Sequence, residues 1–202
     1  MISGIILAAG ESKRMGRPKQ LLSFGSSTIL EHVVENLLRS KIDELILVLG
    51  HESGPIKARF EGAPLRVVLN PEYRQGMSTS ICCGIKEANP ESRALLIALG
   101  DQPLVRSEVV DQLVSAYEEG GSGIVLPSFG GLPGHPVIFD LKYRDALLAL
   151  TGDKGGKSIV EAHPEDVRQV EVETASVVYD IDKWEDYQEQ LEKYLSSRGQ
   201  TC

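Results

Sequence analysis

Short apolar runs alternate with amphipathic stretches along almost the whole chain, and this alternation restricts the fold more than any other feature of the sequence. Residues 4–9, 45–49 and 95–99 are uniformly apolar, which is typical of strands buried on both faces. Residues 66–69 predict a further strand, and a helix with a capping-box start is predicted after Thr28. Strands that alternate with helices favour a mostly parallel sheet covered on both faces. The sequence therefore predicts an α/β protein.

The second half of the chain continues this pattern with more glycine and proline. Ser107 is the expected cap of a helix that ends near residue 119, and residues 120–136 are dominated by loop-forming side chains. No linker or repeat divides the 202 residues, so we expect one domain. The remaining predicted elements are a helix over 78–88, strands over 136–139, 167–172 and 177–181, and helices over 142–150 and 184–195.

Charge and cysteine content limit the classes of partner. The 29 acidic residues outnumber the 21 basic ones, which disfavours binding along a nucleic-acid backbone but allows a small phosphorylated ligand. No apolar stretch approaches 18 residues, so no membrane segment is expected. Three cysteines without metal-type spacing, two of them adjacent, indicate free thiols in a reducing compartment. We therefore expect a cytoplasmic protein.

Polar side chains follow three of the predicted strands where each strand ends. These are the residues after Ala8, the pair Asn70-Pro71 and the pair Gly100-Asp101. In open parallel sheets, ligands bind outside the carboxyl ends of the strands. An Asp in this position is often only a turn former, and Asn-Pro is often a simple turn. Three such ends at one sheet edge nevertheless predict a binding site.

The loop of residues 7–19 has the composition of an anion site. Small residues at positions 8–10 allow close approach to the backbone, whose N–H groups can turn toward a phosphate. Arg14 and Lys19 add a guanidinium fork and a mobile point charge. The spacing is not that of a P-loop, and no GxGxxG motif supports a dinucleotide oxidoreductase. This loop predicts a polyphosphate ligand.

The same loop carries a family resemblance. LAAGESKRMGRPKQLL resembles the LAAGxSxRMGxxK signature of the MobA-like NTP transferases, in particular the molybdenum cofactor cytidylyltransferases of the MocA type. Four further segments resemble the family's motifs in the right order: NPxxxxGxxxS at 70–80, GDQP at 100–103, GHP at 134–136 and DID at 180–182. Lys183-Trp184 departs from the family's Thr-Pro, which affects the assignment of the second metal ligand.

This resemblance implies both a fold and a reaction. The implied fold is a single-domain, Rossmann-like three-layer sandwich over 1–202 with a mostly parallel, mixed sheet, as in nucleotide-diphospho-sugar transferases. The nucleotide-binding part would be about 1–119 and the acceptor-binding part about 120–202. The implied enzyme is a Mg²⁺-dependent nucleotidyltransferase (EC 2.7.7) that transfers CMP from CTP to molybdopterin and releases pyrophosphate. Its partners would be an NTP, a phosphorylated pterin-type acceptor and a transient molybdoenzyme or chaperone, with no nucleic acid and no membrane.

The resemblance also implies roles for individual residues. Arg14, Lys19 and Asp101 would be catalytic, and Asp101 with Asp182 would hold Mg²⁺, with Asp180 as the alternative second ligand. Two carboxylates held that close together predict at least one raised pKa in the metal-free protein. The acceptor would meet His135, Lys154 and Lys157. His135 could equally be a satisfied loop histidine, and a flexible solvated loop is the second choice for the segment that carries the two lysines. The nucleotide would be bound by Leu7, Ala8, Ala9, Gly10, Ser12, Arg14, Lys19, Asn70, Ser78 and Asp101.

Three alternatives remain at this stage. Ala9 gives LAAG, which resembles the cytidylyl branch, whereas the guanylyl branch reads LAGG; GTP is therefore the second choice of nucleotide. A sugar or isoprenoid phosphate is an alternative acceptor. A non-catalytic nucleotide-binding or cofactor-binding accessory protein for a molybdoenzyme is the alternative from another class, and intact Arg14, Lys19 and Asp101 argue against it.

Overall fold

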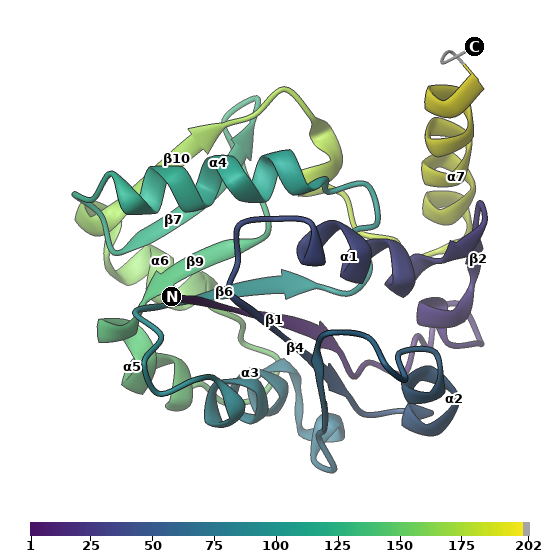
Figure 1. The fold of residues 1–202 in the computed structure, drawn as a ribbon, viewed down its shortest axis with the longest axis horizontal. Helices are drawn as coiled ribbons and strands as arrows, with labels where there is room; N and C mark the ends of the chain where they lie inside the picture. The colour runs from purple at the N-terminus through teal and green to yellow at the C-terminus, as the bar shows by residue number, and fades with distance from the viewer. Residues whose placement is uncertain (200–202) are drawn as a thin grey trace.

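A mixed sheet of eight strands forms the centre of the computed structural model, which describes residues 1–199 (Figure 1). The strand order is β10-β7-β9-β6-β1-β4-β5, and β8 pairs with β7 outside this path. The strands are β1 (Ile2–Ala8), β4 (Glu44–Leu49), β5 (Arg66–Leu69), β6 (Ala94–Leu99), β7 (Ile124–Phe129), β8 (Leu132–Pro133), β9 (Val137–Asp140) and β10 (Val167–Glu171). A separate hairpin is formed by β2 (Ser23–Phe24) and β3 (Ser27–Thr28).

The pairing of the central strands determines where a ligand can bind. β1 lies parallel to both of its neighbours, so that Leu7 is in register with Val48 of β4 and Leu99 of β6. β5 continues the parallel half, and β7 and β10 are parallel to each other. β9 alone in the main path is antiparallel to both neighbours, β6 and β7. The predicted mostly parallel, mixed sheet is confirmed, and the carboxyl ends of β1 and β6 share one edge.

Helices cover both faces of this sheet, because successive strand residues point to opposite sides. Ile6 and Leu47 pack in one core with α1, α2 and α4, whereas Ile5 and Ile46 pack in the other core with α3, α5 and α6. Figure 1 shows α1 and α4 on one side of the sheet and α3 and α5 on the other. The predicted three-layer sandwich is thereby confirmed. The α-helices are α1 (Ile29–Leu38), α2 (Ser53–Ala58), α3 (Met77–Glu87), α4 (Ser107–Glu118), α5 (Arg144–Leu148), α6 (Lys157–Ala162) and α7 (Trp184–Gly199), and the 3-10 turns are η1 (Lys19–Leu21), η2 (Tyr73–Gln75), η3 (Leu141–Tyr143), η4 (Pro164–Asp166) and η5 (Ala175–Val178).

Several local predictions were wrong. The glycine- and proline-rich segment contains β7, in which Pro127 is tolerated because its carbonyl still accepts a bond from Gly134 N–H and its missing N–H breaks only one ladder position. The predicted strand over 177–181 is instead η5 and extended loop, because the Thr174 hydroxyl caps the Ser176 N–H and starts a turn. The N-cap of α4 is Arg106, and Ser107 is its first helical residue.

The predictions on thiols and membrane segments are compared with the described residues only. Cys82 and Cys83 are free thiols on α3, and Cys202 lies outside the described residues. Between residues 1 and 199, no helix combines the length and apolar character needed to span a membrane.

Candidate nucleotide and metal site

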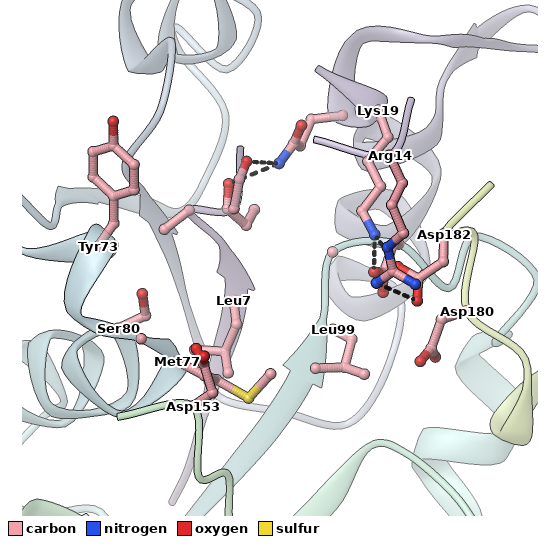
Figure 2. Close-up of a pocket in the computed structure, with 17 residues that line it drawn as sticks. Leu7, Arg14, Lys19, Tyr73, Met77, Ser80, Leu99, Asp153, Asp180 and Asp182 are labelled. Atoms are coloured by element: carbon pink, nitrogen blue, oxygen red, sulfur yellow. Dashed lines mark hydrogen bonds and ion pairs between the residues drawn. The ribbon is translucent and has the colours of Figure 1, made fainter. Parts of the chain in front are cut away.

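The ends of β1 and β6 form the floor of a cavity of about 360 Å³. They are joined by a hydrogen bond of 3.0 Å from Gly100 N–H to Leu7 C=O. An adjoining cavity of about 440 Å³ shares Arg14, Lys19 and Asp153 with the first. Figure 2 shows two walls separated by the floor residues. One wall carries Arg14, Lys19, Asp180 and Asp182, the other carries Tyr73, Met77, Ser80 and Asp153, and Leu7 and Leu99 lie between them.

A buried amide holds the loop after β1 in shape. The Gln20 side chain is only 3% exposed, and its Nε2 donates to the carbonyls of Ala8 and Gly10, both at 3.2 Å. Ser12 Oγ accepts from Lys19 N–H at 3.1 Å and donates to Gln20 Oε1 at 3.4 Å. With these carbonyls engaged, a Cβ built at Gly10 would meet no atom within 4 Å, so the loop backbone is open to a ligand. Sequence reasoning missed Gln20; its position directly after Lys19 was the available signal.

A cluster of two cations and two carboxylates lies beside this loop. Lys19 Nζ is 2.5 Å from Asp101 Oδ2 and 3.1 Å from Asp182 Oδ1, and it also donates to the Ile181 carbonyl at 2.9 Å. Arg14 Nη2 binds the other oxygen of Asp182 at 3.0 Å. Because one ammonium contacts both carboxylates, Asp101 and Asp182 lie well within the separation of about 8 Å that shared metal ligation requires. The structure thus brings Lys19 together with Asp101 and Asp182, which follow it in the chain by 82 and 163 positions.

The pKa of the Asp182 carboxyl is lowered, in contrast to the raised value that repulsion between neighbouring carboxylates would give it. Burial favours the neutral form of Lys19, but the charges of Asp101 and Asp182 outweigh it and raise the Lys19 pKa. Burial likewise opposes charge on Asp182, but Lys19 and Arg14 bring the pKa of its carboxyl below the ordinary value. A raised carboxyl pKa is found instead at Asp180, where burial and then the charge of Asp101 raise it to about 6.

The donor set fits a hard divalent cation. Asp101 Oδ1 is buried and has no hydrogen-bond partner, which leaves one carboxylate oxygen open in the cluster. Asp180 is less suited, because its Oδ1 accepts the Gln102 amide at 2.7 Å. No group of three or more His, Cys, Asp or Glu residues arranged for metal binding occurs among residues 1–199. Mg²⁺ characteristically uses one or two carboxylates together with waters and phosphates, so two carboxylates suffice. The role of Asp101 and Asp182 as ligands stays a prediction.

Two predicted nucleotide contacts lie away from the cavity. Asn70 is buried, and its amide donates to the hydroxyls of Thr79 (2.9 Å) and Ser80 (3.0 Å) while its Oδ1 accepts from Glu72 N–H. These bonds hold the turn before α3. Ser78 is also buried on α3, and neither residue lines the two cavities described above. Ser80, two residues further along the helix, is the serine that reaches the first cavity.

The predicted acceptor residues are dispersed. His135 N–H donates to the Val177 carbonyl, its buried Nδ1 has no partner, and burial lowers the pKa of its ring. Lys157 is 85% exposed and lies 3.7 Å from Glu161. Lys154 is exposed and follows Asp153, which lines both cavities and which sequence reasoning missed. The acceptor role of all three predicted residues stays a prediction.

The loop that carries Asp153 is attached to the start of α3. Gly152 C=O accepts from Ser78 N–H at 3.0 Å. Gly76 has φ +112°, and its Cα lies so close to the Gly152 backbone that a Cβ would overlap it. This contact joins residues from the first and second halves of the chain at one wall of the cavity. The site therefore includes a wall contributed by the segment after residue 120.

Comparisons with known proteins agree with this geometry. The family model described as MobA-like NTP transferase domain matches residues 4–167. The chain is 30% identical over 188 residues to nicotine blue oxidoreductase from Paenarthrobacter nicotinovorans (90% of this chain, 92% of the relative). It is 28% identical over 195 residues to molybdenum cofactor cytidylyltransferase from Escherichia coli K12 (96% and 97%). The first relative is named an oxidoreductase and the second a transferase. The family model agrees with the second, so the chain is assigned to the nucleotidyltransferases.

A solved structure shows the same similarity in three dimensions. The manganese complex of Rv0371C from Mycobacterium tuberculosis H37Rv superimposes with a TM-score of 0.82 and 28% sequence identity. The match covers 95% of this chain and 98% of that chain. Nearly all of the present fold therefore has a counterpart in a protein whose structure contains manganese.

Proposed function

The chain belongs to the MobA-like NTP transferase family and is a nucleotidyltransferase; on this premise we propose that it transfers CMP from CTP to the phosphate of molybdopterin, with Mg²⁺. The observation that carries the proposal is the cluster of Arg14, Lys19, Asp101 and Asp182 beside the loop of residues 7–10. It combines cations for a triphosphate with hard oxygens for a metal at one sheet edge. A relative with bound manganese supports a divalent cation.

The proposed reaction exchanges one phosphorus–oxygen bond for another. An oxygen of the acceptor phosphate attacks the α-phosphorus of CTP, and the bond from that phosphorus to the oxygen bridging to the β-phosphate breaks. Pyrophosphate leaves with the bonding electrons. Such a transfer depends on positioning and charge neutralisation rather than on a protein nucleophile. A bound metal would neutralise phosphate charge at this place.

The protein groups have separate tasks in this proposal. The backbone of residues 7–10 holds the nucleotide, because its carbonyls are engaged by Gln20 and its small side chains leave room. Arg14 and Lys19 bind the triphosphate and the departing pyrophosphate. Asp101 and Asp182 hold the metal.

We propose that the acceptor binds on the opposite wall, near Tyr73, Met77 and Asp153. Of the two predicted acceptor lysines, Lys154 is closer in sequence to this wall, because it directly follows Asp153. This arrangement departs from a division into a nucleotide-binding part over 1–119 and an acceptor-binding part over 120–202 in two places: Tyr73 and Met77 of the first part would meet the acceptor, and Asp182 of the second would serve the metal. A transient molybdoenzyme or chaperone would receive the product.

The base preference rests on two supports. Ala9 gives the LAAG pattern of the cytidylyl branch, and a relative similar over 96% of the chain is named a cytidylyltransferase. GTP and another phosphorylated acceptor are the alternatives within the same chemistry, and an accessory protein that binds without turnover is the alternative outside it. The free thiols of Cys82 and Cys83 support a reducing location, which we propose to be the cytoplasm.

Pyrophosphate release from each of the four NTPs, with purified molybdopterin and Mg²⁺, tests the proposal. We expect the highest rate with CTP. Arg14→Ala removes a charge-assisted phosphate contact of about 1.5–3 kcal/mol, which corresponds to roughly a 10–100-fold loss of rate. Lys57→Ala, an exposed lysine on α2, is the matched control. A wild-type rate in Arg14→Ala, or no release with any nucleotide, contradicts the proposal.

Nucleotide binding can be measured separately by thermal unfolding. CTP should raise the melting temperature more than GTP, and Mg²⁺ should increase the difference. A ligand at about 100 times its dissociation constant adds roughly 2.7 kcal/mol to the free energy of unfolding. A larger shift with GTP would reverse the base assignment, and stabilisation by CTP without pyrophosphate release would favour the accessory protein.

A further inference from the structure

The ammonium of Lys19 has no donor left for a ligand. A lysine ammonium has three N–H donors and no acceptor. In this structure its partners are Asp101 Oδ2, Asp182 Oδ1 and the Ile181 carbonyl, at 2.5, 3.1 and 2.9 Å. The side chain is only 14% exposed. Lys19 therefore cannot contact a triphosphate unless it first releases at least one of these partners.

The same ammonium occupies the position between the two proposed metal ligands. Of the four carboxylate oxygens of Asp101 and Asp182, Lys19 engages one on each residue and Arg14 engages a third. Only Asp101 Oδ1 is without a partner. Within these contacts, the two negative charges are balanced by two positive charges. Asp180 lines the same cavity, but its Oδ1 accepts the Gln102 amide. A divalent cation approaching the free protein must therefore compete with Lys19 for Asp101 and Asp182.

Local structure allows the ammonium to move while the backbone stays in place. Lys19 N–H is bonded to Ser12 Oγ, and the next residue, Gln20, is buried and bonded to the loop carbonyls. The Lys19 side chain is a flexible four-carbon stem that can swing its charge about this fixed point. A triphosphate in the cavity would offer the ammonium new oxygen partners close to the old ones.

From these contacts we infer that Lys19 is an exchangeable occupant of the metal position, so that metal and triphosphate enter the site together. In the nucleotide-free protein, Lys19 holds Asp101 and Asp182 and keeps divalent cations weakly bound. When the triphosphate arrives, the ammonium transfers to its oxygens and the carboxylates become available to the metal. This inference rests on the proposed function and adds an order of binding to it.

Manganese binding without nucleotide tests the exchange directly. Free Mn²⁺ is followed by electron paramagnetic resonance in the wild type and in Lys19→Met, a neutral variant of similar length. We expect Lys19→Met to bind one Mn²⁺ about tenfold more tightly than the wild type, or more, because a unit charge next to the carboxylates is gone. Lys19→Arg, which keeps the charge, and Lys57→Met on α2 should both bind like the wild type. Equal or weaker binding by folded Lys19→Met overturns the inference.

A measurement on the wild-type protein covers the case in which Lys19→Met does not fold. The ¹⁵N resonance of the Lys19 ammonium, identified by its absence in Lys19→Arg, should stay unchanged with Mg²⁺ alone. It should shift when Mg²⁺ is added with a non-hydrolysable CTP analogue. A shift with Mg²⁺ alone at the same concentration overturns the inference.

The outcomes also separate this inference from the proposed function. Tighter Mn²⁺ binding by Lys19→Met in a protein that turns over no NTP would reject the proposed function and leave the occupancy of the carboxylates by Lys19 intact. An active nucleotidyltransferase in which removal of Lys19 does not strengthen Mn²⁺ binding would reject the inference alone.

Discussion

At the scale of single residues, three of the aspartates that line the cavity have different surroundings. Asp101 has one free buried oxygen, Asp182 is bound by two cations, and Asp180 accepts a bond from the Gln102 amide. We expect Asp101→Asn to lower metal-dependent pyrophosphate release more than about 100-fold, a loss of roughly 3 kcal/mol in transition-state stabilisation. Asp182→Asn should raise the metal concentration needed for half-maximal rate. Asp180→Asn should leave that concentration unchanged, and the opposite result for these two variants would make Asp180 the second ligand.

Gln20 provides a second prediction at this scale. Its amide holds the carbonyls of Ala8 and Gly10, which would lose their donors in Gln20→Leu. We expect the free energy of unfolding to fall by about 1–3 kcal/mol, because the carbonyl of buried Ala8 loses this donor. We also expect the KM for the nucleotide to rise, because the loop backbone loses its shape. Urea unfolding and initial rates measure these effects, with Gln112→Leu on the exposed face of α4 as the control. A destabilised variant with unchanged KM would show that Gln20 serves the fold alone.

At the scale of elements, Thr28 and Ser107 both lie at the start of a helix, but they differ in whether the side chain makes a capping hydrogen bond. Thr28 accepts from Glu31 N–H at the start of α1, and Glu31 accepts from Thr28 N–H, which completes the predicted capping box. Ser107 makes no capping bond at the start of α4. Thr28→Ala should therefore lower the free energy of unfolding by about 1 kcal/mol. Ser107→Ala should change it by less than about 0.5 kcal/mol. Chemical denaturation of both variants decides this, and equal losses would contradict the assignment of caps.

At the scale of the whole molecule, Asp166 links three segments of the C-terminal half. Its carboxylate accepts from Gly123 N–H, from the Tyr143 hydroxyl and from Lys142. Bonds from Lys142 and Tyr143 bring its pKa to about 2, below the ordinary value of 3.8. Because the folded protein favours the ionised form, this stabilisation is complete above about pH 4 and is lost as the pH falls toward 2.

Asp166→Asn should therefore be less stable than the wild type at pH 7, by at most about 2 kcal/mol. The difference should shrink in acid and vanish below about pH 2. Unfolding curves recorded between pH 2 and 7 measure it. Asp145→Asn, whose carboxyl is 98% exposed, is the control. A constant difference at every pH would show that Asp166 acts through packing rather than through its charge.

The sequence by itself determined the layer architecture and the chemistry at the ends of two strands. Periodicity is a local property, so the strands that end near Ala8 and Leu99 could be predicted from runs of apolar residues. The loop with Arg14 and Lys19 could be predicted as a polyphosphate site for the same reason: its glycines and cations are adjacent in sequence. β7 could not, because Pro127 and the glycines on either side of it mask a strand that pairing with β9 and β10 stabilises.

Only the tertiary structure decided how these residues are used. The Asn-Pro turn at the end of a strand predicted a nucleotide contact for Asn70, and this stays a prediction; the fold uses the Asn70 amide to bind the hydroxyls of Thr79 and Ser80. The sequence predicted that Lys19 binds phosphate. In the folded protein without nucleotide, its ammonium instead donates to three groups that are far away in sequence. Hydrogen-bond satisfaction of buried groups depends on which segments meet in space, and spacing along the chain does not contain that information. Local pattern thus specified the elements and the charges, while long-range contacts specified which charges are paired in the folded protein.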